Sequence, residues 1–128
     1  MTGQGNRKNL ILLTGDDDVL LTILSQIFTR EGYENHIALD ENTLKAVLDK
    51  KPDVIILDIT RSPSQCLRLL DIMGEAAQKR TIVIASPSDK AHLKSMTTKI
   101  SGEFIPKPFA MGELLAKVSS ILKQYTPE

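Results

Sequence analysis

Short apolar runs alternate along this chain with longer stretches in which apolar residues recur every three or four positions. The short runs cover residues 10–13, 54–57, 81–85 and 104–105, and a weaker run with alternating apolar and polar positions covers residues 33–39. Runs of this length and composition predict β-strands, the weaker one at an edge, and the wider spacing between them predicts amphipathic helices. The order of the elements therefore predicts five strand–helix units.

The helical stretches are recognised by their apolar stripes. They cover residues 20–28, 44–48, 66–77, 88–98 and 114–125, the fourth with the fewest apolar positions. Strict alternation of strands and helices is typical of a parallel sheet with helices on both faces and right-handed crossovers. The expected fold class is thus α/β, a single doubly wound (βα)5 domain with a five-stranded parallel sheet in the order 2-1-3-4-5.

Composition excludes only a few classes of protein. The chain has 128 residues, which suits one domain, and its 16 basic and 16 acidic residues cancel, so that no bulk charge favours nucleic acid or a membrane surface. The single Cys66 and the lack of a long apolar stretch are typical of a soluble protein of the reducing cytoplasm. We expect a disordered tail at residues 1–8, a folded domain at 9–125 and a short tail at 126–128.

Polar side chains follow four of the predicted strands at the point where each strand ends. Asp16 and Asp17 follow the first strand, Asp58 ends the third, Ser86 follows the fourth and Lys107 follows the fifth. In a doubly wound sheet, ligands bind outside the carboxyl ends of the strands, where the strand order reverses. The pattern therefore predicts one site built from these side chains.

The residue types at this edge favour phosphoryl chemistry. Neighbouring carboxylates repel one another unless they are protonated, separated by water or bridged by a cation, and a bridging cation is the simplest of these. Hard oxygen ligands without His or Cys favour Mg²⁺. An aspartate can attack a phosphoryl group, provided that cations neutralise the other phosphoryl oxygens. Lys107 is a candidate for such a cation, and the Ser86 hydroxyl is a candidate hydrogen-bond donor.

Each of these residues also has a purely structural interpretation. The acidic run at residues 16–18 can complement a helix dipole, and Asp58 can cap a turn. Ser86 precedes a proline and can belong to a turn, while Lys107 can be a solvated surface amine. Their coincidence at the ends of four strands favours the functional interpretation.

Four sequence segments resemble the receiver domain of two-component response regulators. They are GDDD at residues 15–18, PDVIILD at 52–58, IVIAS at 82–86 and IPKPF at 105–109, and the resemblance extends over about residues 9–125. It implies the flavodoxin-like version of the expected fold. The chain departs from many relatives after the candidate phosphorylation site, where Cys66 occupies the place of a glycine.

The resemblance implies a role for each residue at the strand ends. Asp58 would accept a phosphoryl group, Lys107 would pair with that group, and Ser86 and Phe104 would be the switch residues. The bond between Lys107 and Pro108 would be cis.

The resemblance also implies a magnesium site. Asp17 and Asp58 would hold Mg²⁺ directly, Asp16 mainly through water, and Thr60 through its backbone carbonyl. Asp18 matches a position that is commonly acidic without being a ligand.

The implied activity is a phosphorylation-dependent switch rather than a conventional enzyme, because the domain catalyses only its own phosphorylation and dephosphorylation. The donor would be a histidine kinase or a phosphotransfer protein, with Val19 and Leu20 helping it to dock. The target would be an output domain or effector protein, with no direct binding to nucleic acid or membrane. The sequence leaves open homodimer formation and whether the chain stands alone or belongs to a larger regulator or hybrid kinase.

Two alternatives follow from the same residues. One is a pseudo-receiver, an interaction module with this fold that is not phosphorylated. The other is a metal-dependent phosphatase or phosphotransferase with an aspartate nucleophile, which the small size of the chain disfavours because little material remains for a substrate-enclosing lid.

Overall fold

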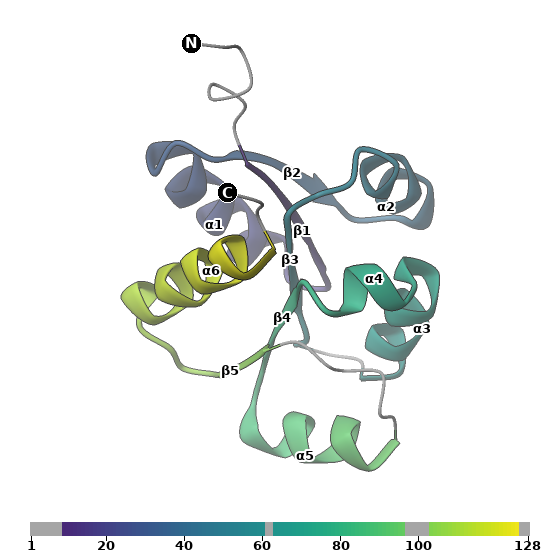
Figure 1. The fold of residues 1–128 in the computed structure, drawn as a ribbon. Helices are drawn as coiled ribbons and strands as arrows, with labels where there is room; N and C mark the ends of the chain where they lie inside the picture. The colour runs from purple at the N-terminus through teal and green to yellow at the C-terminus, as the bar shows by residue number, and fades with distance from the viewer. Residues whose placement is uncertain (1–8, 61–62, 97–102, 126–128) are drawn as a thin grey trace, which may run out of the picture.

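The computed structural model describes residues 9–60, 63–96 and 103–125 and contains one parallel sheet. Its strands are β1 (Leu10–Gly15), β2 (Glu34–Ala38), β3 (Val54–Asp58), β4 (Thr81–Ala85) and β5 (Glu103–Pro106). They lie in the order β2-β1-β3-β4-β5, which confirms the predicted fold class (Figure 1). The predicted tails at 1–8 and 126–128 fall outside the described residues.

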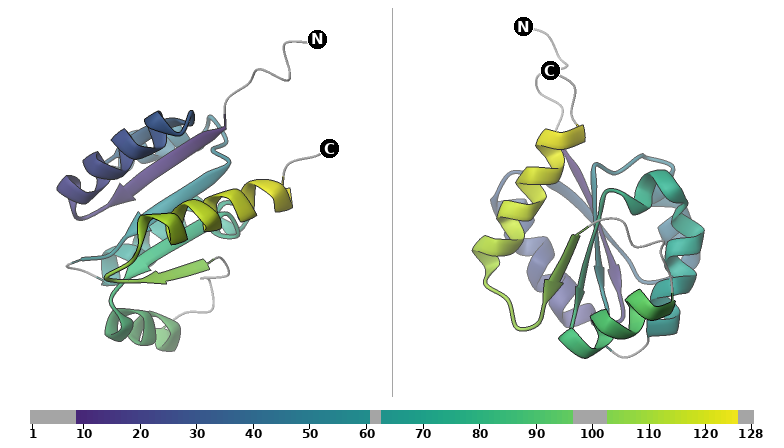
Figure 2. Two further views of the ribbon diagram at one scale, coloured as in Figure 1. Left: turned by 90° about the vertical axis from the view of Figure 1, so that its left-hand side faces the viewer. Right: turned by 60° about the horizontal axis from the view of Figure 1, so that its bottom comes forward.

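Helices cover both faces of the sheet. They are α1 (Asp18–Arg30), α2 (Glu41–Leu48), α3 (Pro63–Met73), α4 (Glu75–Gln78), α5 (Pro87–Met96) and α6 (Met111–Tyr125). The helices α1 and α6 lie on one face, and α2, α3, α4 and α5 lie on the other (Figures 1 and 2). Of the helices in the described ranges, none combines the length and apolar character needed to cross a bilayer.

The central strand β3 is buried on both faces. Ile56 packs with the apolar stripes of α1 and α6, whereas its neighbours Ile55 and Leu57 pack with those of α2, α3 and α5. Each fully buried aliphatic side chain contributes about 1.5–3 kcal/mol relative to an exposed one. Two closed apolar layers therefore hold the strand that ends in Asp58.

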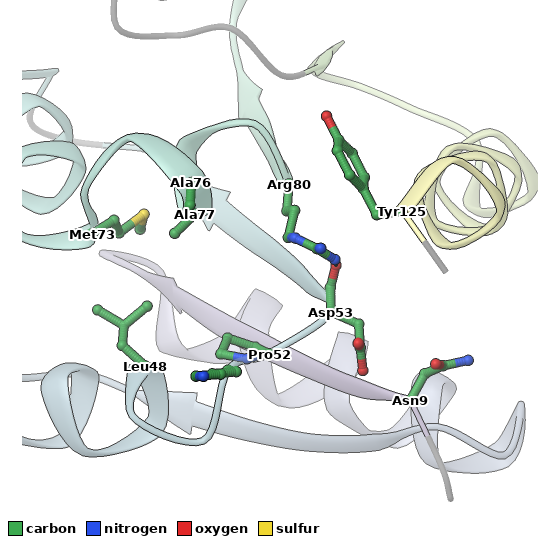
Figure 3. Close-up of a pocket in the computed structure, with 10 residues that line it drawn as sticks. Asn9, Leu48, Pro52, Asp53, Met73, Ala76, Ala77, Arg80 and Tyr125 are labelled. Atoms are coloured by element: carbon green, nitrogen blue, oxygen red, sulfur yellow. The ribbon is translucent and has the colours of Figure 1, made fainter. Parts of the chain in front are cut away.

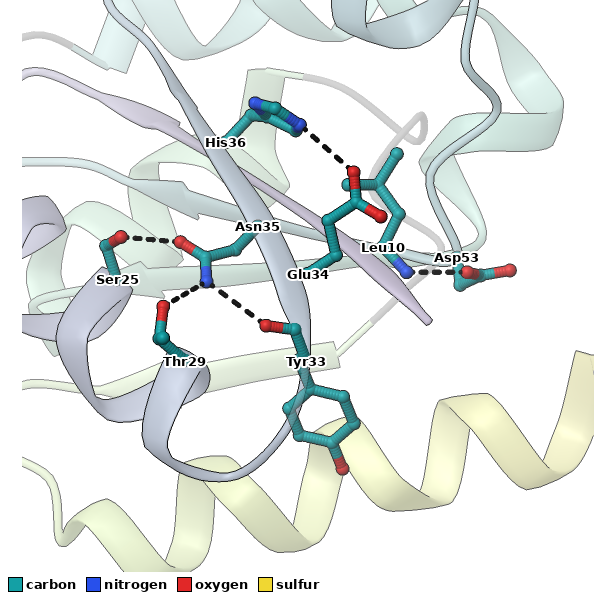
Figure 4. Close-up of polar contacts among 8 residues, drawn as sticks. All are labelled: Leu10, Ser25, Thr29, Tyr33, Glu34, Asn35, His36 and Asp53. Atoms are coloured by element: carbon teal, nitrogen blue, oxygen red, sulfur yellow. Dashed lines mark hydrogen bonds and ion pairs between the residues drawn. The ribbon is translucent and has the colours of Figure 1, made fainter. Parts of the chain in front are cut away.

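The edge strand β2 is tied to its neighbours by polar contacts (Figure 4). The Asn35 side chain accepts from Ser25 Oγ at 2.5 Å and donates to Thr29 Oγ1 at 3.0 Å, both on α1. At the start of β1, the Leu10 amide donates to Asp53 Oδ2 at 2.8 Å. The Asn35 contacts attach β2 to α1, whereas the contact between Leu10 and Asp53 links the start of β1 to the residue before β3. The strand β2 lies at the sheet edge, as the alternating pattern at residues 33–39 predicted.

The apolar periodicity of residues 66–77 predicted one continuous helix, and this prediction is wrong. The structure has two helices there, α3 and α4. Gly74 has φ +84°, a backbone conformation that favours glycine, and it separates α3 from the short α4. Ala77 nevertheless packs on the same apolar cluster as Met73. The apolar spacing continues across the break, and this is why the pattern did not reveal it.

Candidate functional site

The ends of β1 and β3 approach each other closely at the carboxyl edge of the sheet. Gly15 is paired in register with Asp58 and has φ +147°. A Cβ atom on Gly15 would lie 2.3 Å from the backbone oxygen of Asp58, so that only glycine fits there. Because the Asp16 amide then donates to the same oxygen at 3.4 Å, the acidic run at residues 16–18 begins directly beside Asp58.

The Asp58 side chain is buried and paired with a cation. Its Oδ1 lies 2.7 Å from Lys107 Nζ, and its Oδ2 accepts from Thr60 Oγ1 at 2.8 Å. Burial raises the pKa of the Asp58 carboxyl above its ordinary value, while the contacts with Lys107 and Thr60 oppose that rise. The site thus holds a desolvated carboxylate against one positive charge.

Lys107 is not the solvated surface amine of the structural interpretation. Its side chain is only 25% exposed, and Nζ also donates to the Ile59 carbonyl at 3.1 Å and to Thr60 Oγ1 at 2.7 Å. The peptide bond between Lys107 and Pro108 is cis, as the resemblance implied. The structure therefore brings the end of β5 to the end of β3.

Thr60 connects three residues of the site through contacts that the sequence did not reveal. Its amide donates to Asp16 Oδ1 at 2.8 Å, and its hydroxyl lies between Asp58 and Lys107. The sequence analysis assigned Thr60 only a backbone carbonyl role. A hydroxyl residue two positions after a strand-end aspartate was the available signal for the side-chain contacts.

The chemistry of the acidic residues suits Mg²⁺, because Asp16, Asp17 and Asp58 offer carboxylate oxygens and Thr60 offers a carbonyl. All three carboxylates have other partners in the structure. Asp16 Oδ1 accepts from the Thr60 amide at 2.8 Å, Asp17 Oδ1 accepts from the Leu20 amide at 3.1 Å as the N-cap of α1, and Asp58 pairs with Lys107. Within residues 9–60, 63–96 and 103–125, no group of three or more His, Cys, Asp or Glu residues is arranged so that it could hold a metal ion. The structural and metal-binding interpretations of Asp17 are compatible, since its carboxylate has two oxygens.

The two predicted switch residues both contact α5. Ser86 accepts the Lys90 amide through its carbonyl at 2.9 Å and the Asp89 amide through its hydroxyl at 3.1 Å, which starts the helix. The Phe104 ring faces the ammonium groups of Lys90 and Lys94, at 5.3 Å and 5.6 Å from its centroid. The two lysines are four residues apart on one helix face, a spacing that the sequence analysis overlooked.

Cys66 lies buried on α3, on the side of the sheet packed against Leu57 and Ile59. Burial raises the pKa of its thiol to about 12, and the negative charge of Asp16 adds to the effect. Because the thiolate is the reactive form, this residue behaves as an apolar packing group.

Asp58→Asn should raise the free energy of unfolding by about 1 kcal/mol at neutral pH, a typical size for a change at a buried polar group. Burial raises the pKa of Asp58 in the folded state above its value in the unfolded chain. The folded state then holds more protons between the two pKa values, and stability falls as the pH rises through that window. Asn does not titrate, so its advantage should grow from acidic to neutral pH in urea unfolding followed by circular dichroism. A variant less stable than wild type at neutral pH would contradict this account.

A family model for the response regulator receiver domain matches residues 11–119. The transcriptional regulatory protein CpxR of Klebsiella pneumoniae is 26% identical over 116 residues, which cover 91% of this chain and 50% of CpxR. The chain thus spans about half the length of this relative.

Solved structures share the fold. A protein described as a transiently phosphorylated "switch" in bacterial signal transduction superposes with a TM-score of 0.75 at 23% identity, over 94% of this chain and 98% of that one. The receiver domain of the sensor histidine kinase PA1611 from Pseudomonas aeruginosa PAO1 has a TM-score of 0.68 at 17% identity, over 91% of this chain and 99% of that one. That receiver domain has a magnesium ion coordinated in its active-site cleft. At these identities, the structural likeness concerns the fold alone.

Proposed function

We propose that this chain, which belongs to the response regulator receiver domain family, is a switch that accepts a phosphoryl group on Asp58. Membership in the family confirms the resemblance drawn from the four segments at the strand ends. The observation that carries the proposal is the contact of 2.7 Å between Asp58 Oδ1 and Lys107 Nζ at the buried end of β3. A carboxylate held beside a cation can act as a nucleophile toward a phosphoryl group.

The proposed step is transfer from a phosphohistidine of a histidine kinase or phosphotransfer protein. A carboxylate oxygen of Asp58 attacks the phosphorus, an O–P bond forms, and the P–N bond to the imidazole breaks. The imidazole nitrogen keeps the electron pair and takes a proton from solvent. The product is an acyl phosphate on Asp58, which water later hydrolyses to restore the carboxylate and release inorganic phosphate.

Two cations would support this step. Lys107 already lies beside Asp58 and can neutralise one phosphoryl oxygen as negative charge enters the site. Asp16, Asp17, Asp58 and the Thr60 carbonyl offer the oxygen ligands for Mg²⁺, and binding the ion would require the three carboxylates to turn toward one point, since they are not so arranged in the described residues. When bound, this ion neutralises phosphoryl oxygens and orients the group for attack.

The signal would leave the site through α5 and β5. A phosphoryl group on Asp58 offers an acceptor to the Ser86 hydroxyl, which now caps α5. Movement of Ser86 would release space that the Phe104 ring can fill, at the cost of its contacts with Lys90 and Lys94. The changed surface would then bind an output domain, an effector protein or a second copy of the chain.

Asp17→Asn should weaken Mg²⁺ binding at least about tenfold, the scale expected when a metal ligand or its close support is lost. Asn caps helices as well as Asp does, so that α1 should keep its N-cap and the change should act on the metal. Isothermal titration calorimetry with MgCl₂ measures the effect. The matched control is Asp18→Asn, which removes the neighbouring charge and should change the affinity less than about threefold, the weight of one nearby charge. Equal losses in the two variants would contradict the assignment of Asp17.

Val19 and Ile23 form an exposed apolar pair on α1, with side chains 66% and 46% exposed. Leu20, which the sequence analysis grouped with Val19, packs partly against the core formed with α6. Val19→Glu together with Ile23→Glu should slow phosphoryl transfer from a phosphorylated donor protein at least about tenfold, because charge is poorly accepted in an apolar contact. Labelling by acetyl phosphate, which needs no docking face, should stay unchanged. Slowing of both reactions would contradict a docking role.

The direct test of the proposed function is incubation with Mg²⁺ and acetyl phosphate, followed by intact mass spectrometry. A mass increase of one phosphoryl group supports the proposal. An unchanged mass at saturating donor would favour the pseudo-receiver. The proposal includes a cytoplasmic location, which agrees with the free, buried thiol of Cys66.

A further inference from the structure

A cavity of about 680 Å³ lies where β1, β3 and β4 begin (Figure 3). Asp58 lies at the opposite end of β3. Three of the residues that line it, Asn9, Asp53 and Arg80, directly precede β1, β3 and β4. The length of β3, about 16 Å, separates this cavity from the Asp58 site. The proposed phosphorylation chemistry does not use it.

The wall of the cavity is divided into an apolar part and a polar part. Leu48, Met73 and Ala77 line one end, and Asn9, Asp53 and Arg80 line the other (Figure 3). Pockets of this size, with mostly apolar walls and a few convergent polar groups, are typical of small-ligand sites in proteins.

Arg80 is held in position at the polar end. Its guanidinium lies 4.6 Å from the centroid of the Tyr125 ring, and Nη1 donates to the Asp53 carbonyl at 3.4 Å. A guanidinium has five donors in a planar fork that matches a carboxylate. Positioned against an aromatic ring, this side chain can bind an anionic group without much loss of conformational freedom.

Lys51 adds a second positive charge to the lining. Its φ of +56° is unusual for a residue other than glycine, and it is a conformation that costs about 1–2 kcal/mol. This conformation belongs to the turn that ends α2, where the Lys51 amide donates to the Leu48 carbonyl at 2.9 Å. The lining also contains one negative charge, the carboxylate of Asp53. Its Oδ2 already accepts from the Leu10 amide at 2.8 Å. The lining therefore favours a negatively charged ligand.

We propose that this cavity binds a small amphipathic anion. A flat apolar body would lie between Leu48, Met73 and Ala77, and a carboxylate would lie at Arg80 and Lys51. Apolar contact alone would not select the charge of the ligand, whereas Arg80 and Lys51 do.

The test is a titration of the full chain with 2-naphthoate, followed by two-dimensional ¹H–¹⁵N NMR. We expect saturable shifts centred on the cavity residues with a Kd of about 0.1–1 mM, the range for a ligand of this size. Arg80→Gln should weaken binding at least about fivefold. The matched control Arg30→Gln removes the same charge from the exposed end of α1, outside the cavity, and should leave the Kd unchanged. The exposed Ala76 on α4 allows a second variant, Ala76→Trp, which should block the cavity while the rest of the spectrum shows a folded domain.

Two further measurements test whether charge selects the ligand and whether the cavity is independent of the Asp58 site. The cation 2-naphthylmethylammonium has the same ring system and should bind at least about fivefold more weakly if charge selects the ligand. Asp58→Asn should bind 2-naphthoate like the wild type, which separates this site from the phosphorylation site. Absence of saturable shifts, equal binding of the two naphthalene ligands, or insensitivity to both Arg80→Gln and Ala76→Trp would overturn the proposal.

Discussion

Asp58→Asn is expected to abolish phosphorylation, while the wild-type protein gains one phosphoryl group from acetyl phosphate in the presence of Mg²⁺. An amide oxygen is a far weaker nucleophile than a carboxylate, so that the acyl phosphate cannot form at this position. Intact mass spectrometry measures the modification. Beryllofluoride, which mimics a phosphoryl group, should give bound fluorine resonances with the wild type only.

Asp53→Asn is the matched control for this experiment. It removes a carboxylate from the residue that precedes β3, whereas Asp58 ends the same strand. Labelling should persist in this variant, because Asp53 is remote from Lys107 and the acidic run. Phosphorylation that survives in Asp58→Asn, or that is lost equally in Asp53→Asn, would show that Asp58 is not the acceptor.

Lys107→Met should lower the free energy of unfolding by about 2 kcal/mol or more at mildly alkaline pH, because it leaves the buried Asp58 charge without its cation. At mildly acidic pH the loss should shrink. Burial already raises the pKa of Asp58, and removal of Lys107 takes away an interaction that lowers it, so that the carboxyl binds a proton and loses its charge as the pH falls. Urea unfolding at the two pH values, followed by circular dichroism, measures the difference.

Two further variants show whether the effect comes from this pair. Lys117→Met removes a lysine that pairs with Glu103 at 3.1 Å near the surface, and it should cost less than about 1 kcal/mol. In the Asp58→Asn background, Lys107→Met should cost much less than in the wild type, because no buried charge remains. A loss from Lys107→Met that is the same at both pH values and in both backgrounds would show that Lys107 acts through packing alone.

Much of the fold was predictable because positions that are buried in the structure carry apolar side chains in the sequence. The run at residues 54–57 is apolar at every position, and the structure buries it on both faces of the sheet. The break at Gly74 did not interrupt the apolar pattern, because Ala77 packs on the same apolar cluster as the residues before the break. Periodicity reports which side chains are buried, whereas a change of direction depends on one backbone dihedral angle.

The sequence indicated which residues lie at the candidate site, but it did not indicate the hydrogen bonds and ion pairs that these residues form. The topological rule for doubly wound sheets placed Asp58 and Lys107 at one edge, and the structure brings them to 2.7 Å. The hydroxyl of Thr60 between them, and the capping of α1 by Asp17, required coordinates. Position in the chain limits where a side chain can lie, but its partners depend on which rotamer the surrounding atoms allow.

The alternation of strands and helices, the parallel sheet and the set of polar residues at its carboxyl edge could all be inferred from the order of amino acids. These features follow from local spacing and from the burial of apolar side chains, which neighbouring residues largely specify. The partial burial of Lys107 beside Asp58, and the cavity between Leu48, Met73 and Arg80 at the other end, became visible only in the folded arrangement of the chain. Both features join residues far apart in the chain, and their geometry depends on how whole elements pack together.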